Sequence, residues 1–342
     1  MENQAVSSSA LSSGSTKDKK YKGSSHPNRA FGVIIRKEIA DHIRSWRFLV
    51  LVGLVLLTFV ASLYVSVSNI RTAFTNTNDP DHAFMYLKLL TSTDNAMPPF
   101  HVLLSFLAPL LGISMGFDAI NSEQNNGTLT RLLAQPIYRD NLLLAKFSSA
   151  IMIVGMLFLS LTLLMIGGGL VLTGVRLEAQ ELIRIMGFVF VTLLYVAFYL
   201  SLSILLSIVF RQPATAALSA LGLWLFFTVF YPIIVNLVIR AFLPDPAYLT
   251  QAQVMGYNEF ILDMMRIAPN QLYTDAATTL LMPSIRSLGP MSMEQMAGAI
   301  PSPLPVKESL MIVWPQLSGM IAASTGCFAI AYYLFMRREI RS

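Results

Sequence analysis

The chain has 342 residues, of which 54% are hydrophobic and only 13% are charged, and its formal net charge is +5. Soluble domains carry about a quarter charged residues, so this composition excludes an ordinary soluble globular protein and indicates a membrane protein. The short alternating apolar segments of a transmembrane barrel do not occur in the sequence. We therefore predict an all-α polytopic membrane protein.

The first 30 residues are polar, with eight serines and four lysines and no apolar central stretch. Low hydrophobicity with clustered charge predicts a disordered cytoplasmic tail over residues 1–30, and a cleaved signal peptide is not expected. Residues 31–46 then place Phe31 and four isoleucines near one face at helical spacing. This pattern predicts an amphipathic helix on the cytoplasmic membrane surface, with a simple extension of the first span as the alternative.

Six apolar runs are each about 20 residues long, enough for a helix to cross the ~30 Å hydrocarbon core of a bilayer. The runs cover residues 48–67, 100–117, 148–172, 186–210, 214–238 and 312–335. Residues 48–238 would thus hold five transmembrane helices, and residues 312–335 the sixth, before a basic cytoplasmic tail at residues 336–342. Between the spans we expect an external loop at residues 71–99, a cytoplasmic segment at 118–147, and an external segment with two to four short helices at 239–311.

The distribution of charge over this topology explains the net charge without nucleic-acid binding. With the N-terminus inside, the cytoplasmic segments hold 16 lysines and arginines and 8 acids, whereas the external segments hold 8 and 11. Basic residues concentrated on the cytoplasmic side follow the positive-inside pattern. We therefore predict a multi-pass protein of the cytoplasmic (cell) membrane, with both termini in the cytoplasm and no nucleic-acid partner.

The segment between the second and third spans is too polar to cross a membrane, but EQNNGTLTRLLAQPIYRDNLLLAK (residues 123–146) carries a helical pattern. Gly127 permits a sharp turn, Asn126 or Thr128 can cap a helix, and Pro136 disfavours helical geometry at the residue before it. A helix of about eight residues, roughly 12 Å long, is predicted. Its single apolar face holds Leu129, Leu132 and Leu133.

A short helix with a leucine face below the bilayer is suited to docking in a groove on another protein. The alternatives are a helix that lies flat on the lipid surface or packs on its own neighbours. Asp118 and Glu123 lie at the cytoplasmic end of the second span, where they would contact the partner, pair with Arg131 or Arg139, or be solvated. We expect the Lys146 ammonium to reach back to the cytoplasmic interface.

The stretch FDAINSEQNNGTLTRLLAQPIYRDNLLLAK resembles the signature of ABC-2-type transporter permeases. In that family an acid and a Gly-Thr-Leu precede Leu-Leu, a Pro, an Arg and a Lys. The matching positions are Glu123, Gly127, Thr128, Leu129, Leu132, Leu133, Pro136, Arg139 and Lys146. Two positions depart from the family, because many members have an Arg where this chain has Gln124 and a second acid where it has Asn126. The six-helix layout is also similar, so the resemblance covers nearly the whole chain.

The resemblance implies that membrane transport and ATP hydrolysis are carried out by different subunits. Such permeases pair with a separate cytoplasmic ABC ATPase, which binds ATP and Mg, and the short helix after the second span transmits ATP-driven motion. The chain would then be the membrane subunit of an exporter, working with a second permease copy that is identical or similar. It would bind no cofactor and have no enzyme activity of its own. The sequence also has no Gly-x-x-x-x-Gly-Lys-Ser/Thr phosphate loop.

Two other classes of function remain open at this point. One is a non-transporting membrane scaffold or maturation factor anchored to an ATPase, for example in copper-site assembly, because some related permeases serve nitrous-oxide-reductase maturation. The other is an ion-driven carrier, which is disfavoured because the spans lack buried acids or broken helices in paired halves.

Two further groups of residues are candidates for substrate or metal contacts. Tyr195, Tyr199, Ser203 and Ser207 recur every four residues on the fourth span and would line a translocation path or form hydrogen bonds between helices. Met291, Met293 and Met296 offer soft thioethers that suit Cu(I), although methionines on an amphipathic helix usually pack. The four histidines show no close metal-ligand spacing.

Overall fold

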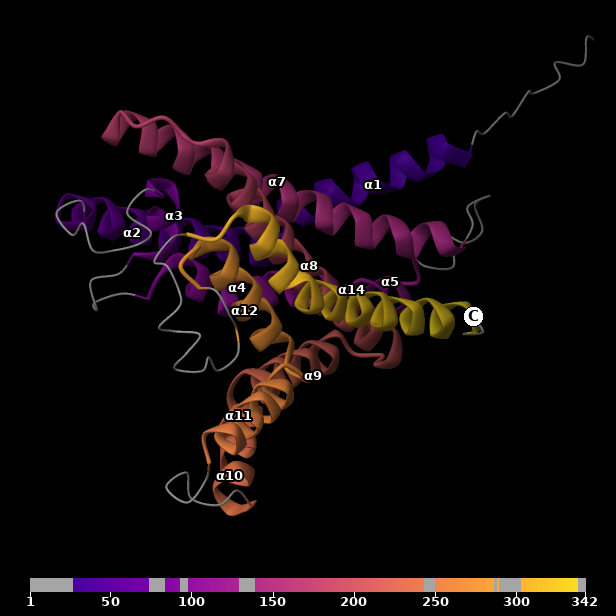
Figure 1. The fold of residues 1–342 in the computed structure, drawn as a ribbon. Helices are drawn as coiled ribbons and strands as arrows, with labels where there is room; N and C mark the ends of the chain where they lie inside the picture. The colour runs from indigo at the N-terminus through magenta and orange to yellow at the C-terminus, as the bar shows by residue number, and fades with distance from the viewer. Residues whose placement is uncertain are drawn as a thin grey trace, which may run out of the picture.

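The structure is a computed structural model that describes residues 27–73, 84–92, 98–128, 139–242, 250–285, 288 and 303–337. Every regular element in these ranges is a helix (Figure 1). The elements are α1 (Pro27–Arg44), α2 (Trp46–Ala73), α3 (Met85–Thr91), α4 (Phe100–Gly116), α5 (Asn121–Asn125), α7 (Arg139–Thr173), α8 (Ala179–Val209), α9 (Pro213–Leu225), the π-helix η1 (Phe226–Phe230), α10 (Tyr231–Phe242), α11 (Gln251–Met265), α12 (Pro269–Leu281) and α14 (Val306–Arg337).

Six of the described helical stretches are long and apolar enough to cross a bilayer, which confirms the predicted fold class. They are Trp46–Ser68, Phe100–Asn125, Asp140–Leu172, Ala179–Val209, Pro213–Ala241 and Val306–Arg337. Each begins at or before the predicted start, the third, fourth and sixth by six to eight residues, and the second ends eight residues later than predicted. The extensions arise because polar end residues continue the helix beyond the apolar run. The fifth span is formed by α9, η1 and α10 in succession, and its π-turn was not predicted.

Helix α8 lies at the centre of the bundle and packs against α4, α14, α12, α9 and α7. About two thirds of the most apolar part of α8 and of α4 is buried, against about a fifth to a quarter for the first, third and sixth spans. The α4–α8 contact is close because two glycines face α8. A Cβ added at Gly112 would lie 2.7 Å from the Val196 carbonyl oxygen, and one at Gly116 would lie 2.9 Å from the Ser203 Cβ.

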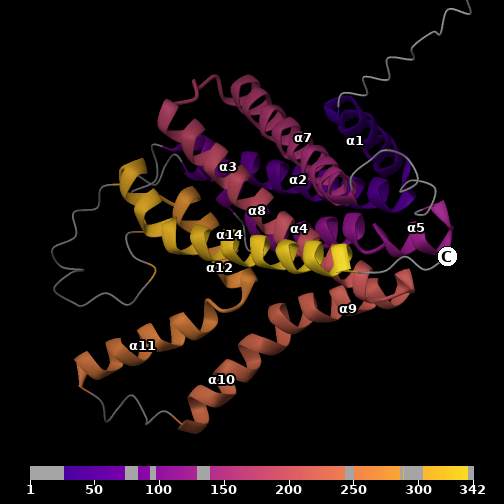
Figure 2. The same ribbon diagram turned by 90° about the vertical axis from the view of Figure 1, so that its right-hand side faces the viewer.

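Helix α1 is a separate element, since it ends at Arg44 and α2 begins at Trp46. It packs against α7 and α2, with Ile34 buried and Ile43 half exposed. In both views α1, α5 and the end of α14 lie at one end of the bundle, whereas α3 and α12 lie toward the other (Figures 1 and 2). The described ends of the chain are therefore on the same side.

The region at residues 71–99 is more structured than expected. We predicted a loop, but Met85–Thr91 forms α3, whose apolar side chains are buried against α2, α4, α7, α8 and α12. The segment at residues 239–311, which we predicted to be external, contains α11 and α12 in its described part. Helix α12 packs into the bundle against α14 and α8, whereas α11 contacts α10, and the two extend away from the bundle as a hairpin (Figure 2).

Candidate functional site

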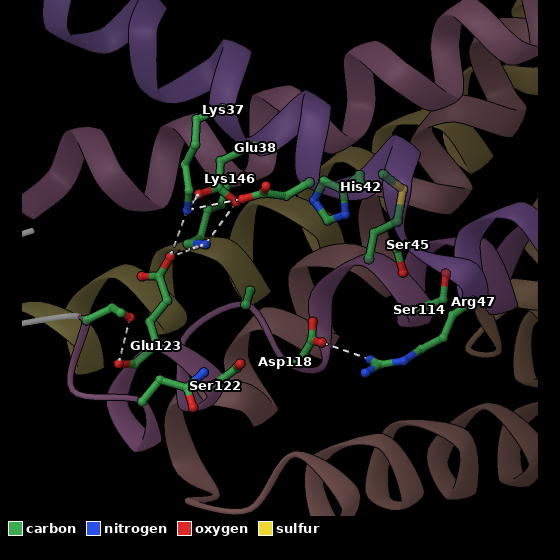
Figure 3. A pocket seen from close by; sticks show the side chains of 15 residues that line it. Lys37, Glu38, His42, Ser45, Arg47, Ser114, Asp118, Ser122, Glu123 and Lys146 are labelled. Carbon is green, nitrogen blue, oxygen red and sulfur yellow. Dashed lines mark hydrogen bonds and ion pairs between the residues drawn. The ribbon is translucent and has the colours of Figure 1, made fainter.

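A cavity of about 590 Å³ lies at the end of the bundle that carries α1 and α5. Its walls come from α1, the first turn of α2, the end of α4 with α5, and the second turn of α7 (Figure 3). The charged and titratable side chains that line it are Lys37, Glu38, Asp41, His42, Arg47, Asp118, Glu123 and Lys146. The site therefore joins the predicted cytoplasmic ends of the first three spans to the amphipathic helix.

Lys146 of α7 is the centre of a buried ion-pair network. Its Nζ lies 2.9 Å from Glu38 Oε2 of α1 and 2.8 Å from Glu123 Oε1 of α5. The three side chains are only 8%, 6% and 12% exposed. Lys37 completes the network from a half-exposed position, 3.0 Å from Glu38 and 3.6 Å from Glu123. The network thus links α1, α5 and α7, which are far apart in the sequence.

A second ion pair closes the other end of the cavity. Arg47, in the first turn of α2, lies 2.8 Å from Asp118 Oδ2, and its guanidinium is 4.9 Å from the centroid of the Phe117 ring. Both charged side chains are partly exposed, at 60% for Arg47 and 32% for Asp118. This pair ties the start of the first span to the end of the second.

The electrostatics of α1 follow from these contacts. Burial opposes charge on Glu38, but the Coulombic attraction and hydrogen bonds of Lys146 and Lys37 outweigh it and lower its pKa. Burial also opposes charge on Lys37, yet its carboxylate neighbours, Glu38 first, raise its pKa above the ordinary value. The pKa of His42 is lowered, chiefly because burial disfavours the imidazolium. At neutral pH Glu38 and Lys37 are therefore charged and His42 is neutral.

The chain leaves the network through a tight turn. Gly127 has a φ of +66°, the left-handed conformation that favours glycine, as predicted. The Thr128 hydroxyl donates to the Glu123 carbonyl oxygen at 3.1 Å, and the Asn125 amide donates to the Arg211 carbonyl oxygen at 3.0 Å. These bonds fix the start of the predicted docking segment. Leu129, Leu132, Leu133 and Pro136 lie outside the described residues, as do Arg131 and the side chain of Arg139.

The described residues supply ion-pair partners that were not expected. Glu123 pairs with Lys146 and Lys37, and Asp118 pairs with Arg47. Pairing with Arg131 or Arg139 stays a prediction, because both side chains lie outside the described residues. The predicted reach of Lys146 to the cytoplasmic interface stays a prediction. The sequence did not indicate that α1 covers Lys146 and supplies an acid that neutralises it. Glu38 was missed. Its signal was an acid on the apolar face of a helix, four residues after Ile34.

The polar stripe on α8 is fully buried and faces its helical neighbours. The Ser203 hydroxyl donates to the Ile113 carbonyl oxygen at 3.1 Å, and the Ser207 hydroxyl accepts from the backbone N–H groups of Ile120 and Asn121 at 3.0 and 3.2 Å. The Tyr195 hydroxyl donates to the Ser105 carbonyl oxygen, and Tyr199 is buried beside it. These contacts are hydrogen bonds between helices, and a role in a translocation path stays a prediction.

Two buried charges at the opposite end of α8 were not singled out from the sequence. Glu181 accepts the backbone N–H of Tyr86 at 2.8 Å and so holds the start of α3. Arg184 donates to the carbonyl oxygens of Leu280 and Leu304 and to the Ser309 hydroxyl, and so joins α12 to α14. Only their burial reveals them, since both lie before residue 186, where the predicted fourth span begins.

Metal binding has no support in the described part of the chain. No group of three or more His, Cys, Asp or Glu side chains there is arranged to hold a metal ion. Met291, Met293 and Met296 lie outside the described residues, so the copper prediction is not addressed by the structure.

The helical architecture with six apolar, membrane-length helices defines a multi-pass integral membrane protein. The family described as "ABC-2 family transporter protein" matches residues 33–340, so the chain belongs to the ABC-2 transporter family. A curated relative from Pseudomonas aeruginosa, described as "Probable ABC transporter permease protein NosY", is 29% identical over 203 residues. That match covers 58% of this chain and 66% of the relative, just under two thirds of its length. The resemblance to ABC-2 permeases is confirmed.

Proposed function

We propose that the chain is the permease subunit of an ATP-driven exporter in the cell membrane, with both termini in the cytoplasm. The observation that carries this proposal is the family match over residues 33–340, which includes the segment after the second span. The excess of basic residues in the segments on the N-terminal side supports the orientation. ATP and Mg are bound by a separate cytoplasmic ABC ATPase, and this chain supplies the membrane path without enzyme activity.

In this proposal the ATPase docks on the segment that begins at Gly127. The leucine face at Leu129, Leu132 and Leu133 enters a groove on the ATPase, as amphipathic helices do in other complexes. The preceding residues give the segment a firm base, because Glu123 is held by Lys146 and Lys37 and Asn125 by the Arg211 carbonyl. Because these contacts hold the base of the segment, a movement of the segment on ATPase closure is transmitted to the spans.

The ion pairs define the route of that motion. From Glu123 the network leads through Lys146 to Glu38 and α1, and the Arg47–Asp118 pair connects the second span to the first. Closure of the ATPases would thus move the cytoplasmic ends of the first three spans together with α1. The coupling would run through these two sets of ion pairs between packed helices, the kind of network that can carry energetic coupling between sites.

A second permease copy completes the transporter in this proposal. In the most apolar part of the fifth span only 6% of the residues are buried by the described chain, although Ala216 and Ala220 pack against neighbouring helices. Its remaining surface is free for lipid or for a second copy, and two copies would bring two docking segments to a pair of ATPases.

A maturation role is the second candidate, because some permeases that resemble this chain serve nitrous-oxide-reductase maturation and the Pseudomonas aeruginosa relative is named NosY. A maturation factor would still dock an ATPase, so the two candidates differ in what crosses the membrane. Transport of a labelled substrate would favour the exporter. ATPase stimulation without substrate movement would favour the scaffold or maturation factor.

The docking proposal is tested by co-purification with the candidate ATPase in lipid nanodiscs. The variant Leu132→Asp plus Leu133→Asp should lose the ATPase, because two charges enter an apolar contact. Thr130→Asp plus Ala134→Asp is the matched control, since it adds the same charge in the same segment away from the leucine face at helical spacing. Equal binding by all three proteins would refute the docking assignment, and loss in both variants would assign the effect to charge alone.

A further inference from the structure

The cavity beside α1 lies at the depth where a bilayer has its headgroups. Arg47 belongs to the start of the first span, with Ser45 just before it, and Asp118 and Ala119 belong to the end of the second. Lys146 belongs to the second turn of the third span. All three helices cross the hydrocarbon region beyond these residues. A polar cavity at this level opens to the interfacial layer rather than to the hydrocarbon core.

The charges that line the cavity do not balance among the described residues. The described lining holds four acidic side chains, Glu38, Asp41, Asp118 and Glu123, and three lysine or arginine side chains, Lys37, Arg47 and Lys146. The inner cations are engaged, since Lys146 contacts two carboxylates and Lys37 three. One oxygen of Glu123 is buried without a hydrogen-bond partner among the described residues. The site thus has an excess of one negative charge and favours a ligand that brings an ammonium group.

The mouth of the cavity offers a partner for an anion as well. Arg47 is 60% exposed and pairs with Asp118, which is 32% exposed (Figure 3). The Arg47 guanidinium also lies over the Phe117 ring. A guanidinium is well suited to bind a phosphate. A zwitterionic ligand can bind between Arg47 and Asp118 in place of their direct ion pair. Its phosphate then binds Arg47 and its ammonium binds Asp118, so each side chain keeps a partner of opposite charge.

The surroundings of Arg47 indicate that the zwitterion is part of a lipid. From Trp46 onward, the outer face of α2 is apolar and uncovered, with Trp46 at 78% and Leu57 at 66% exposed. Acyl chains can run along this face while the headgroup reaches the cavity. We propose that the cavity is a binding site for the headgroup of a primary-amine zwitterionic phospholipid, that is, phosphatidylethanolamine.

The chemistry of the headgroup allows a first test that needs only the wild-type protein. A primary ammonium donates hydrogen bonds to carboxylates, whereas the trimethylated ammonium of phosphatidylcholine cannot. Native mass spectrometry of the full chain, loaded from mixed micelles with equal amounts of both lipids, should show retention of phosphatidylethanolamine over phosphatidylcholine by about tenfold. Equal retention would overturn the proposal.

Two variants and one control locate the site. Asp118→Asn should abolish the preference for phosphatidylethanolamine, and Arg47→Gln should lower retention of both lipids. Asp263→Asn removes a 75% exposed acid of α11 that also pairs with an arginine, and it should leave retention unchanged. A preference that survives Asp118→Asn in a protein with wild-type thermal stability would overturn the assignment to this cavity.

The source of the zwitterion is tested by competition. Soluble glycerophosphoethanolamine carries the same headgroup without acyl chains, and it should not displace the lipid at equal concentration. Displacement by the soluble compound would overturn the lipid assignment. These measurements use the permease without an ATPase, so their outcome is independent of the docking test above.

Discussion

Replacing Lys146 with methionine should destabilise the contact between α1 and α7 more than any other single charge removal on α1 or α7. The Lys146 side chain is 8% exposed and contacts Glu38 and Glu123, which are 6% and 12% exposed. Removing one partner of a buried pair costs about 3–5 kcal/mol, because the remaining charge is left uncompensated. Lys37 still lies 3.0 Å from Glu38, so we reduce the expected cost to about 2–4 kcal/mol.

Lys37→Met is the matched control, because Lys37 contacts the same two acids from a half-exposed position. Exposed pairs contribute about 0–1 kcal/mol, so its effect should be within that range. The double variant Lys146→Met plus Glu38→Gln removes both halves of the buried pair. It should cost about 1–3 kcal/mol less than the sum of the single variants.

The free energy of unfolding is measured by denaturant titration in micelles, and hydrogen exchange of α1 amides reports where the structure loosens. The reasoning predicts faster exchange throughout α1 in Lys146→Met and little change in Lys37→Met. An effect of Lys37→Met as large as that of Lys146→Met would refute it. So would strictly additive effects of Lys146→Met and Glu38→Gln.

Three further predictions concern other contacts. Gly112→Ala should lower the free energy of unfolding by about 1–3 kcal/mol, because its Cβ would lie 2.7 Å from the backbone of α8. A Cβ at Gly53 would have nothing within 4 Å, so Gly53→Ala should be neutral or slightly stabilising in thermal unfolding. Arg184→Met should leave buried carbonyl acceptors without a donor, which lowers the free energy of unfolding by about 1–3 kcal/mol for each acceptor and speeds hydrogen exchange in α12. Arg176 is exposed, so Arg176→Met should leave exchange in α12 unchanged. The lowered pKa of His42 means that the undocked helix binds more protons, so α1 should loosen as pH falls below the ordinary value of 6.5. His42→Gln should remove this loosening of α1 at low pH. A variant whose α1 amides show the same dependence of hydrogen exchange on pH as the wild type would contradict the account.

The membrane-spanning helices were predictable because each is a long apolar run with few competing interpretations. The turn at Gly127 was predictable for a similar reason, since only a residue without Cβ adopts its φ of +66° without strain. Both features are encoded by residues that are close together in the sequence.

The features that sequence reasoning missed depend on contacts between distant residues. Lys146 is buried only because Glu38, 108 residues earlier, covers and neutralises it. Helix α3 has just seven residues, too few to give a periodic signal, and it is helical because the bundle buries it. In the sequence Arg184 is indistinguishable from an exposed residue. It is buried because the fold places the carbonyl groups of Leu280 and Leu304, about 100 residues later, within hydrogen-bond distance.

The central claim is that the segment beginning at Gly127 docks a separate ATPase. Its most direct test is photocrosslinking in native membranes, with a photoreactive amino acid at position 132 and, as a control, at the exposed position 260 of α11. The account predicts that position 132 captures a nucleotide-binding subunit with a phosphate loop and that position 260 does not. Crosslinks from position 132 to lipid alone, or capture of the same subunit from position 260, would contradict it.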